Sequence, residues 1–500
     1  MSSSLRKEKV ISESGLKKAI LSPVEVLAQS IANIAPSATP ALVIPLVFYF
    51  AGNGTWLSYL FATIAIVLVG ANLNQYTRRS ASPGSLYSYV VKGLGSGTGV
   101  ISGWALVLAY LLTASAVLAG FINYANVLLS GIGITVSPLV IGLIGVGIAW
   151  FIAIKDIKLS ATLMLAFEII SLVLIFVLAV VVLAKSGFKI DISQIKLKGV
   201  TPSGIGLGLV LAFFSFVGFE SAASLGDEAK KPLKTIPRAV TTSAVFVGVF
   251  FIILSHTEIL GFAGQATKLN ESAAPLADLA SFTGIGILGP LISIGALISF
   301  WSCFLACINA GARVLFSMGQ HGLFHSSVGN AHEENKTPHV AITISTILAA
   351  AVTFILIITR GGLFNIAEFY KSNDLIISIY GWTGTIATYG FIFVYALISI
   401  SAPVYLYREK ELKGKHIALS VITVLTLLVP IVGSVYSNST SPAPFPSFIF
   451  IFVGWLVTGG LWFFIRKQQN PNVGDRISGQ VENIHQHFKE IRVNGDGEGI

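Results

Sequence analysis

The 500-residue sequence carries 54% hydrophobic and only 11% charged residues, with a formal net charge of +9 and a mean hydropathy of +0.80. Soluble proteins carry about 25% charged residues, so this chain has too little polar material to cover a surface that faces water. The composition excludes an ordinary soluble domain and indicates a polytopic membrane protein whose main partner is the lipid bilayer.

Apolar stretches long enough to cross a bilayer recur along the whole chain. Twelve spans are predicted, at 23–50, 55–76, 98–129, 136–154, 159–184, 203–226, 238–262, 283–318, 339–359, 374–403, 417–436 and 446–465. The first stretch lacks an obvious signal-peptide cleavage site and leads directly into further spans, so we interpret it as a membrane span. The polar residues 466–500 are expected to form a mobile cytosolic tail.

Lysine and arginine gather in alternate loops, which predicts the orientation of the chain. The segment 1–22 is basic, and further basic loops follow every second span, whereas residues 51–54 and 431–446 hold no lysine or arginine. The loop 185–202 is the exception, with four lysines. The bias predicts a protein of the plasma membrane with both termini in the cytoplasm. It also accounts for the positive charge, so no nucleic-acid partner is expected.

The first span, SIANIAPSATPALVIPLVFYF at 30–50, carries Pro36 and Pro40 near its middle. Each proline removes an N–H and obstructs the carbonyl four residues earlier, those of Ala32 and Pro36. Free carbonyls on one side and the N-terminus of a second half-helix on the other would suit the two charges of a zwitterion. A simple proline kink is the alternative, and this stretch alone leaves both interpretations open.

If the first ten spans are two inverted halves of five, the partner of the first span is the sixth. Its core reads LVLAFFSFVGFESAASLGDEAKKP, with Gly218 near mid-depth, Ser215 beside it and four phenylalanines around them. No proline is present, so Gly218 marks either a second break or a close contact between helices.

The stretch AFFSFVGFESAASLGDEAKKPLKTIPRA resembles the sixth span and following loop of the amino acid-polyamine-organocation permeases. Four other stretches resemble the same family in the same order: PGSLYSYVVKGLG at 83–95, GARVLFSMGQHGLF at 311–324, KTPHVA at 336–341 and TYGFIFVYALISISAPVYLYR at 388–408. The resemblance covers about 380 residues. Each piece is weak alone, but five in the right order are specific.

The resemblance implies an all-α, leucine-transporter-like fold of two inverted five-helix repeats with two extra helices. It divides the chain into a cytosolic segment at 1–22, a first repeat at 23–184, a second repeat at 203–403, two added spans at 417–465 and a cytosolic tail at 466–500. It also implies secondary transport of an amino acid or a related amine, by proton symport or by exchange.

The resemblance also implies where the substrate binds. Pro36, Ser37 and Ala38 match the small-residue segment that binds the substrate carboxylate. Phe214, Ser215 and Phe216 match the segment whose carbonyls hold the amine, with Phe216 as a gating aromatic. The full expected binding set is Ile34, Ala35, Pro36, Ser37, Ala38, Phe214, Ser215, Phe216 and Gly218. Pro36 replaces the usual glycine, which puts the close approach of a carboxylate in doubt and hints at a different substrate.

Glu168 lies about ten residues into the fifth span, which is about 15 Å or half of the hydrocarbon core. Burial disfavours a charged carboxyl, so intramembrane acids are functional candidates by default. In many family members a lysine near this region replaces a sodium ion, and here the only ionisable candidate is an acid. We predict that Glu168 couples transport to protons or holds the substrate amine; a structural carboxyl is the alternative.

Other ionisable residues receive plainer interpretations. Glu220, Asp227 and Glu228 could form an inner gate with basic residues, although interfacial charge pairing is favoured. The basic candidates are Arg78, Arg79, Lys92 and Arg313. His256 and Glu258 are expected at the membrane interface. Cys303 and Cys307 share one helix face without metal-binding neighbours, so small packing residues are the favoured interpretation. No metal and no cofactor are expected.

Other functions fit less well. The sequence has no zinc-type cluster or nucleophile elbow for an enzyme, no phosphate loop for a pump and no carbonyl filter for a channel. A metal-ion carrier of this fold would want an acid in the first span and a soft ligand in the sixth, and neither is found. A sodium-coupled amine transporter can also show an aspartate in the first span, where Asn33 is the nearest residue to one. A polyamine or other organic-cation permease of the same fold remains the principal alternative to an amino acid permease, and a channel is a more distant one.

Overall fold

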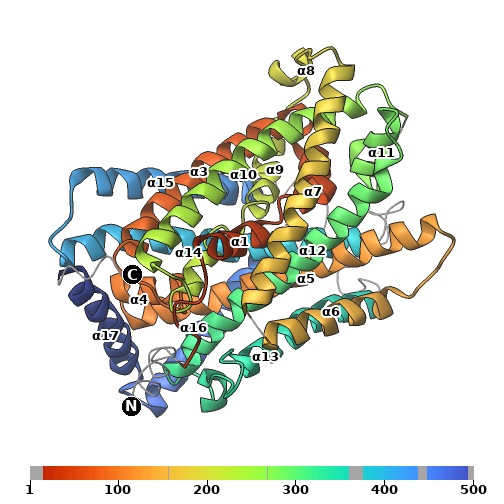
Figure 1. The fold of residues 1–500 in the computed structure, drawn as a ribbon. Coiled ribbons are helices and arrows are strands. Elements are labelled where there is room, and N and C mark those ends of the chain that lie inside the picture. The colour runs from red at the N-terminus through yellow and green to blue at the C-terminus, as the bar shows by residue number, and fades with distance from the viewer. Residues whose placement is uncertain (1–14, 156, 267, 360–374, 437–446, 494–500) are drawn as a thin grey trace.

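The computed structural model describes residues 15–155, 157–266, 268–359, 375–436 and 447–493. Within these residues the chain is a helical bundle, and its extended pairing is limited to one isolated bridge between Leu21 and Ala229 (Figure 1). Ten described stretches are long and apolar enough to cross a membrane. The protein is therefore an all-α polytopic membrane protein.

In the described residues, the first half of the chain holds one interrupted helix and four long helices. Its elements are α1 (Pro23–Ile34), η2 (Thr39–Val43), α2 (Ile44–Ala51), η3 (Gly52–Gly54), α3 (Thr55–Thr77), α4 (Leu86–Leu94), α5 (Ser96–Gly131), α6 (Pro138–Lys155), α7 (Ile157–Lys185) and α8 (Ile192–Ile195). The interrupted helix is formed by α1, η2 and α2, and the long helices are α3, α5, α6 and α7. The second half repeats the theme of an interrupted helix followed by long ones. Its elements are α9 (Pro202–Phe214), η4 (Ser221–Leu225), α10 (Pro232–Phe262), η5 (Leu269–Glu271), α11 (Pro275–Phe282), α12 (Leu288–Gln320), η6 (Ser326–Gly329), α13 (His339–Ile358), α14 (Leu375–Arg408), α15 (Gly414–Tyr436), α16 (Phe448–Gln469) and α17 (Val473–Val493).

The predicted spans coincide with these helices to within a few residues, apart from the broken ones. The first two predicted spans lie in the continuous apolar stretch Pro23–Thr77. The sixth corresponds to the shorter apolar helix Pro202–Phe214 and the turns after it. The first two predicted spans therefore count as one stretch, and the sixth is too short to be counted. The count of twelve spans stays a prediction.

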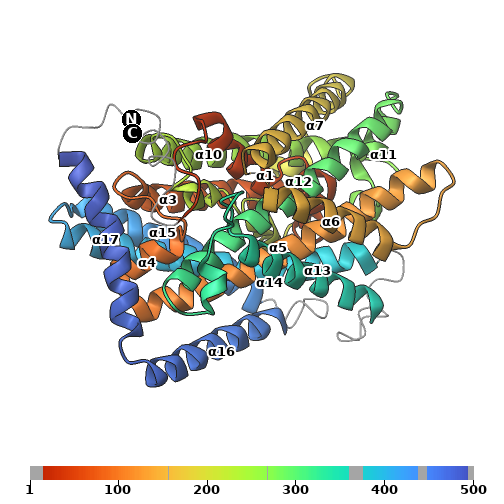
Figure 2. The same cartoon turned by 60° about the horizontal axis from the view of Figure 1, so that its bottom comes forward.

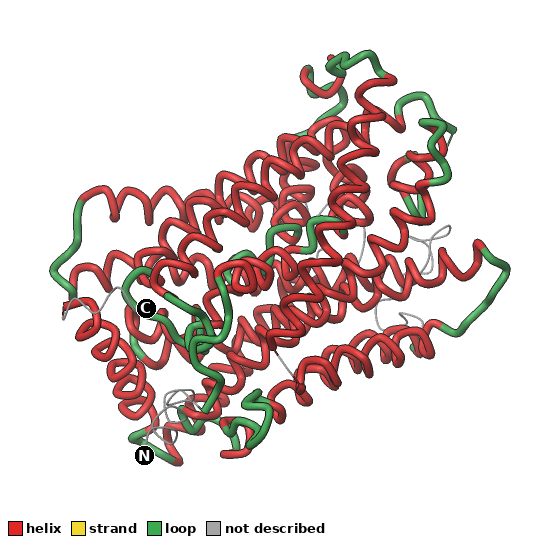
Figure 3. The backbone as a smooth tube through the Cα atoms, viewed as in Figure 1, coloured by secondary structure: helices red, strands yellow, loops and turns green. Residues whose placement is uncertain are grey.

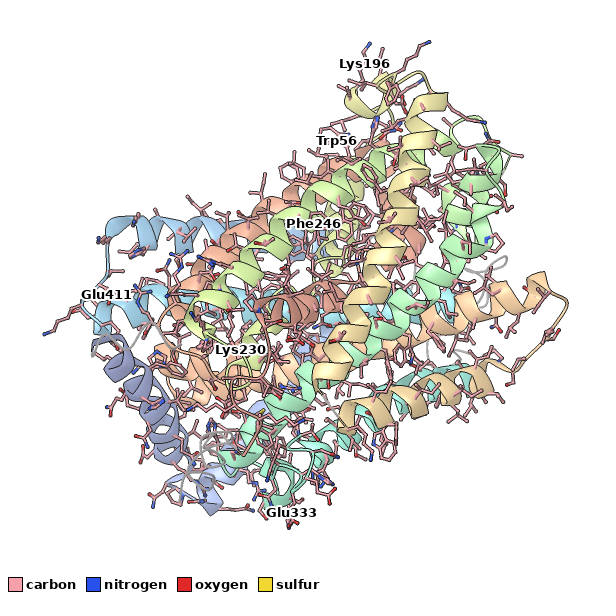
Figure 4. All side chains as sticks on the ribbon, viewed as in Figure 1. Trp56, Lys196, Lys230, Phe246, Glu333 and Glu411 are labelled. Carbon is pink, nitrogen blue, oxygen red and sulfur yellow. The ribbon has the colours of Figure 1, made fainter. Side chains whose placement is uncertain are left out.

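The long helix α5 runs through the interior and packs along α12 and α14. Helices α6 and α13 lie together on one side, and α16 lies on the outer edge of the bundle (Figure 2). We call the two ends of the bundle the α17 end, which holds α4 and α17, and the α8 end, which holds α8 and α11 (Figure 1). Lys196 lies at the α8 end and Glu411 and Glu333 at the α17 end, with the apolar Phe246 between them (Figure 4).

The outer helices present apolar side chains outward. Helix α16 exposes Phe450, Val457, Leu461 and Phe464, and α6, α7 and α15 expose similar rows. Exposed apolar surface on this scale is unfavourable in water and suits contact with lipid chains.

Helices α9 and α15 touch through two glycines. A Cβ on Gly206 would lie 2.9 Å from the Cα of Gly433, and a Cβ on Gly433 would lie 2.7 Å from the Cα of Gly206. Small residues allow such backbone contact between membrane helices, where dispersion contacts must provide much of the attraction.

Residues 473–493 correct one expectation, because they form helix α17 rather than a mobile tail. Val473, Ile477, Val481 and His485 recur every fourth residue and are all buried against the α17 end of the bundle. Glu482 pairs with Lys92 of α4, and Lys489 pairs with Glu409 at 3.1 Å. A polar composition concealed an amphipathic stripe that packs against the bundle.

Candidate functional site

The first span is broken where the two prolines predict it. Helix α1 ends at Ile34, Ala35 adopts the left-handed conformation with φ 49°, and the next helical turn begins at Thr39. Pro40 occupies the first turn of that second segment, where a missing N–H costs little. The non-helical backbone lies inside the bundle (Figure 3), so the break is an interruption and not a kink.

The sixth predicted span is also broken. Helix α9 ends at Phe214, and the chain turns through residues 215–220 before the short helix η4. Gly218 has φ 92°, a conformation that an L side chain rarely adopts. The carbonyls of Ser215 and Val217 accept no hydrogen bond from the described residues.

The two breaks lie against each other. A Cβ on Gly218 would lie 2.5 Å from Cγ of Asn33, so the glycine is required both by its φ and by this contact. The Ser30 hydroxyl donates to the Phe219 carbonyl at 2.8 Å, and the Ser221 hydroxyl donates to the Gln29 carbonyl at 3.2 Å. Side chains therefore satisfy backbone groups that both helices lose at their breaks.

The two cysteines support the first break, a role that the sequence did not reveal. Cys303 Sγ donates to the Asn33 carbonyl at 3.1 Å, and Cys307 Sγ donates to Oδ1 of Asn33 at 2.8 Å. Both are free thiols, 4.0 Å apart on one face of α12, as the spacing predicted. They do more than fill space, because they hold Asn33, which lies in the last turn of α1.

Glu168 reaches the first break from α7. Its Oε1 accepts a hydrogen bond from the backbone N–H of Ser37 at 2.9 Å, and its side chain is fully buried. The N–H of Ala38 donates to the Ala35 carbonyl at 2.9 Å, and Pro36 has no N–H. Each amide in the predicted carboxylate-binding segment is thus absent or occupied.

Aromatic rings surround the second break. The Tyr59 hydroxyl of α3 lies 3.1 Å from Oγ of Ser215. Phe216 is fully buried and packs edge-on against Phe251 of α10, with ring centroids 5.3 Å apart. Phe214 packs against Tyr380 of α14 at 5.7 Å. All nine predicted binding residues are buried around the two breaks, and their role in binding stays a prediction.

The sequence matches the amino acid permease family over residues 25–466. The chain belongs to the amino acid permease family. This match confirms the resemblance read from the five sequence stretches, and the fold is that of the amino acid-polyamine-organocation superfamily.

Individual permeases are more distant. A branched-chain amino acid permease of Bacillus subtilis is 25% identical over 330 residues, which is 60% of this chain and 68% of the relative. A methylthioribose transporter of the same organism is 25% identical over 60% of this chain and 67% of its own length. The vacuolar cationic amino acid transporter 4 of Arabidopsis thaliana is 24% identical over 67% of this chain and 58% of its own length. The family and these relatives are transporters, and their named cargoes differ.

The permease also contains a buried carboxylate that side chains from two helices contact. Glu220, after the second break, accepts hydrogen bonds from Tyr110 of α5 at 2.7 Å and from Tyr395 of α14 at 2.6 Å. The favoured interpretation as an interfacial ion-pairing residue is therefore wrong for Glu220. The two tyrosines lie far away in sequence, so no local pattern could have identified them.

One predicted gate pair is present. Arg313 of α12 donates from Nε and Nη2 to the two carboxylate oxygens of Glu228, at 2.8 and 2.9 Å, and both side chains are 1% exposed. The N-terminal segment pairs with the same loop through Leu21 N–H to the Glu228 carbonyl at 2.9 Å. The other gate candidates bind elsewhere, with Arg79 on Glu411 and Lys92 on Glu482.

The described residues include no group of three or more histidine, cysteine, aspartate or glutamate side chains that could hold a metal ion. The polar groups at the breaks are suited to bind a small organic ion through backbone carbonyls, hydroxyls and one carboxylate.

Proposed function

We propose that this permease is a secondary active transporter that moves an amino acid or a related amine by alternating access around its two broken helices. The observation that carries this proposal is the contact between the breaks, where Gly218 meets Asn33 and Glu168 meets Ser37. Exposed backbone polarity at this depth is costly in lipid, and a substrate that satisfies it gains binding energy.

The amine of the substrate would bind the free carbonyls of Ser215 and Val217. These groups accept no hydrogen bond from the described residues and lie beside the Ser215 hydroxyl, which Tyr59 contacts. Phe216 would close the site by moving with its neighbour Phe251.

The carboxylate of an amino acid would compete with Glu168 for the Ser37 amide. A charged Glu168 holds this amide strongly, whereas a protonated Glu168 is a weaker acceptor and releases it more easily. A proton on Glu168 and a carboxylate on Ser37 would therefore bind together, which links substrate uptake to a proton gradient.

An organic-cation permease is the second candidate, and the same contact favours it. If the substrate lacks a carboxylate, Glu168 keeps the Ser37 amide and supplies the negative charge itself. Pro36 in place of glycine, with no N–H to offer, fits this alternative.

Uptake into proteoliposomes, measured for the twenty amino acids and several amines with and without a pH gradient, tests both candidates. Saturable uptake of a carboxylate-bearing substrate that rises with an inward proton gradient supports the first. Uptake restricted to amines supports the second, and flux that does not saturate would indicate a channel. Trp in place of the buried Ala38 should abolish binding while the protein still folds, and unchanged affinity would contradict the placement.

We further propose that the α17 end faces the cytoplasm of a plasma-membrane protein, because most basic loops lie on that side in sequence. The buried Arg313–Glu228 pair would then close the cytoplasmic side in the state described here.

A further inference from the structure

Glu258 of α10 is the most unusual charge in the permease. Its side chain is 1% exposed, and among the described residues neither of its carboxylate oxygens has a hydrogen-bond partner. The sequence analysis expected it at the membrane interface, near the end of its span, and did not anticipate that the helical bundle buries it. A buried carboxylate without a partner is costly, so such a group marks a place where a cation or a proton binds.

The neighbours of Glu258 locate it beside the substrate site. Glu258 lies close enough to Tyr59 and Tyr124 to act on both electrostatically. The Tyr59 hydroxyl contacts Ser215 at the second break, and the Tyr124 hydroxyl donates to the Ala41 carbonyl at 3.0 Å, just after the first break. The two tyrosines that approach Glu258 are thus bound to the two broken spans.

Helix geometry gives the direction and reach. Glu258 lies seven residues after Phe251, on the same face of α10, which places it about 10 Å further toward the α8 end. Phe251 packs against both Tyr59 and Phe216. The side chains of Phe251 and Glu258 both lean toward the N-terminus of α10, so the offset of about 10 Å along the helix applies to the side chains as well. An offset of this order suits a short diamine or a lysine-like side chain with a hydrogen bond at each end.

Asp278 of α11 adds a second negative charge in the same region. It also acts electrostatically on Tyr124, and its carboxylate accepts the Ser272 hydroxyl at 2.5 Å. Asp278 therefore has a donor of its own, whereas Glu258 has none among the described residues.

We propose that Glu258 binds a second ammonium group of the substrate, so that the permease takes cationic amino acids or diamines, with one amine at Ser215 and the other at Glu258. This inference rests on the proposed function and names its substrate class. The tyrosines Tyr59 and Tyr124 would line the passage between the two amines and offer their π faces and hydroxyls to the cation.

The test compares substrates that differ only in the second ammonium group. Uptake of lysine and ornithine is measured against norleucine and norvaline, and uptake of putrescine against butylamine, in proteoliposomes of the full chain. Wild type should take up at least one of lysine, ornithine and putrescine, which carry the second ammonium group. Glu258→Gln should raise KM for the substrate with the second ammonium group at least tenfold. It should leave KM for the matched compound without that group within twofold of wild type. Glu258→Asp should recover part of the lost affinity.

Glu271→Gln is the matched control, because Glu271 lies at the same end of the bundle and pairs with Lys268 at 3.3 Å on the surface. Glu271→Gln should change KM neither for the compounds with a second ammonium group nor for those without it. Uptake of norleucine or butylamine alone by wild type would overturn the inference and leave the proposed transport intact. An equal change of KM for both members of a pair in Glu258→Gln would also overturn it. No saturable uptake of any compound would overturn the proposed function together with this inference.

Discussion

Glu168 and Ser37 are joined by one hydrogen bond of 2.9 Å, from a backbone amide of the first break to a carboxylate on a different span. A carboxylate of the protein thus occupies a group that the family resemblance assigns to the substrate. Uptake should therefore respond to the charge of Glu168 as well as to its shape.

Glu168→Gln preserves the shape and removes the charge change. If the proton on Glu168 frees the Ser37 amide, the variant should lose accumulation driven by a pH gradient and keep substrate exchange between the two sides. If Glu168 holds an amine instead, affinity should fall at every pH. Radiolabelled uptake and counterflow in the same vesicles separate these results, with Glu333→Gln on an exposed loop as the control. Normal affinity together with normal pH-driven uptake would leave Glu168 a structural carboxyl.

Gly218→Ala should abolish transport, because the new methyl group meets Asn33 at 2.5 Å and the residue must keep φ 92°. We expect uptake at least tenfold below wild type and a lower melting temperature in detergent. Gly454→Ala in α16 is the matched control, since a Cβ there meets nothing within 4 Å. Equal effects of the two substitutions would contradict the contact between the breaks.

Glu228→Gln should open the α17 end, because it leaves the Arg313 guanidinium buried without its counter-charge. Breaking a buried pair in this way costs about 3–5 kcal/mol. Cys303 and Cys307 are buried and are the only cysteines in the chain, so the rate of their alkylation by N-ethylmaleimide reports the opening. We expect faster alkylation in Glu228→Gln and little change in Glu411→Gln, which loses a partly exposed pair with Arg79. A rate unchanged from wild type would show that the pair does not close this end.

Docking of α17 should weaken in acid because of His485. Burial, and then the charges of Lys92 and Lys489, lower the pKa of His485 to about 3 in the docked state. An undocked histidine has its ordinary pKa near 6.5, so the docked state loses about 1.4 kcal/mol for each pH unit below that value. The contribution of His485 to the docking of α17 is therefore complete above about pH 6.5 and is lost progressively as the pH falls toward about 3.

This change is measured by the hydrogen-exchange protection of residues 473–493 at pH 7 and pH 5, corrected for the intrinsic exchange rate at each pH. His485→Asn keeps a side chain that can bond to the Tyr405 hydroxyl, 2.9 Å away in wild type, and should remove most of the pH dependence. His325→Gln on an exposed turn should retain it. If the corrected protection of α17 is the same at the two pH values, the prediction is contradicted.

Orientation is tested by labelling single cysteines from outside intact cells, in a Cys303→Ala and Cys307→Ala background. Positions 52–54 at the α8 end should react, and 410–415 at the α17 end should not. The predicted outer positions 438–442 lie outside the described residues and should react as well. Labelling at 410–415 would reverse the topology.

The sequence was sufficient wherever the cause is local. Two prolines four residues apart break α1 because each removes a donor, and no distant contact is needed to predict that. Counting residues along the fifth span predicted mid-depth for Glu168, and the structure shows its carboxylate at the first break. The same reasoning left Gly218 ambiguous, because its φ and its contact with Asn33 depend on how two helices cross.

Features that depend on distant partners were missed for the same reason. Glu220 was assigned an interfacial charge pairing, yet its partners are Tyr110 and Tyr395, which only the folded bundle brings together. Glu258 was expected at the interface because it lies near a helix end, and its burial was missed because it depends on distant elements such as α11 and η2, which contact α10. In α17, polar residues outnumber the buried stripe, so composition indicated a mobile tail.

The backbone contact of Gly206 with Gly433 restricts how this chain can change over evolutionary time. A larger residue at one position would normally be accommodated by a smaller one at the other. Here each partner is already the smallest residue that exists, so neither helix can make room for a substitution in the other. A larger residue at either position would therefore require one of the two helices to shift as a whole, and a single substitution in the other helix cannot provide that room. The added helix α15 and the broken helix α9 are therefore expected to drift together, as one inherited unit.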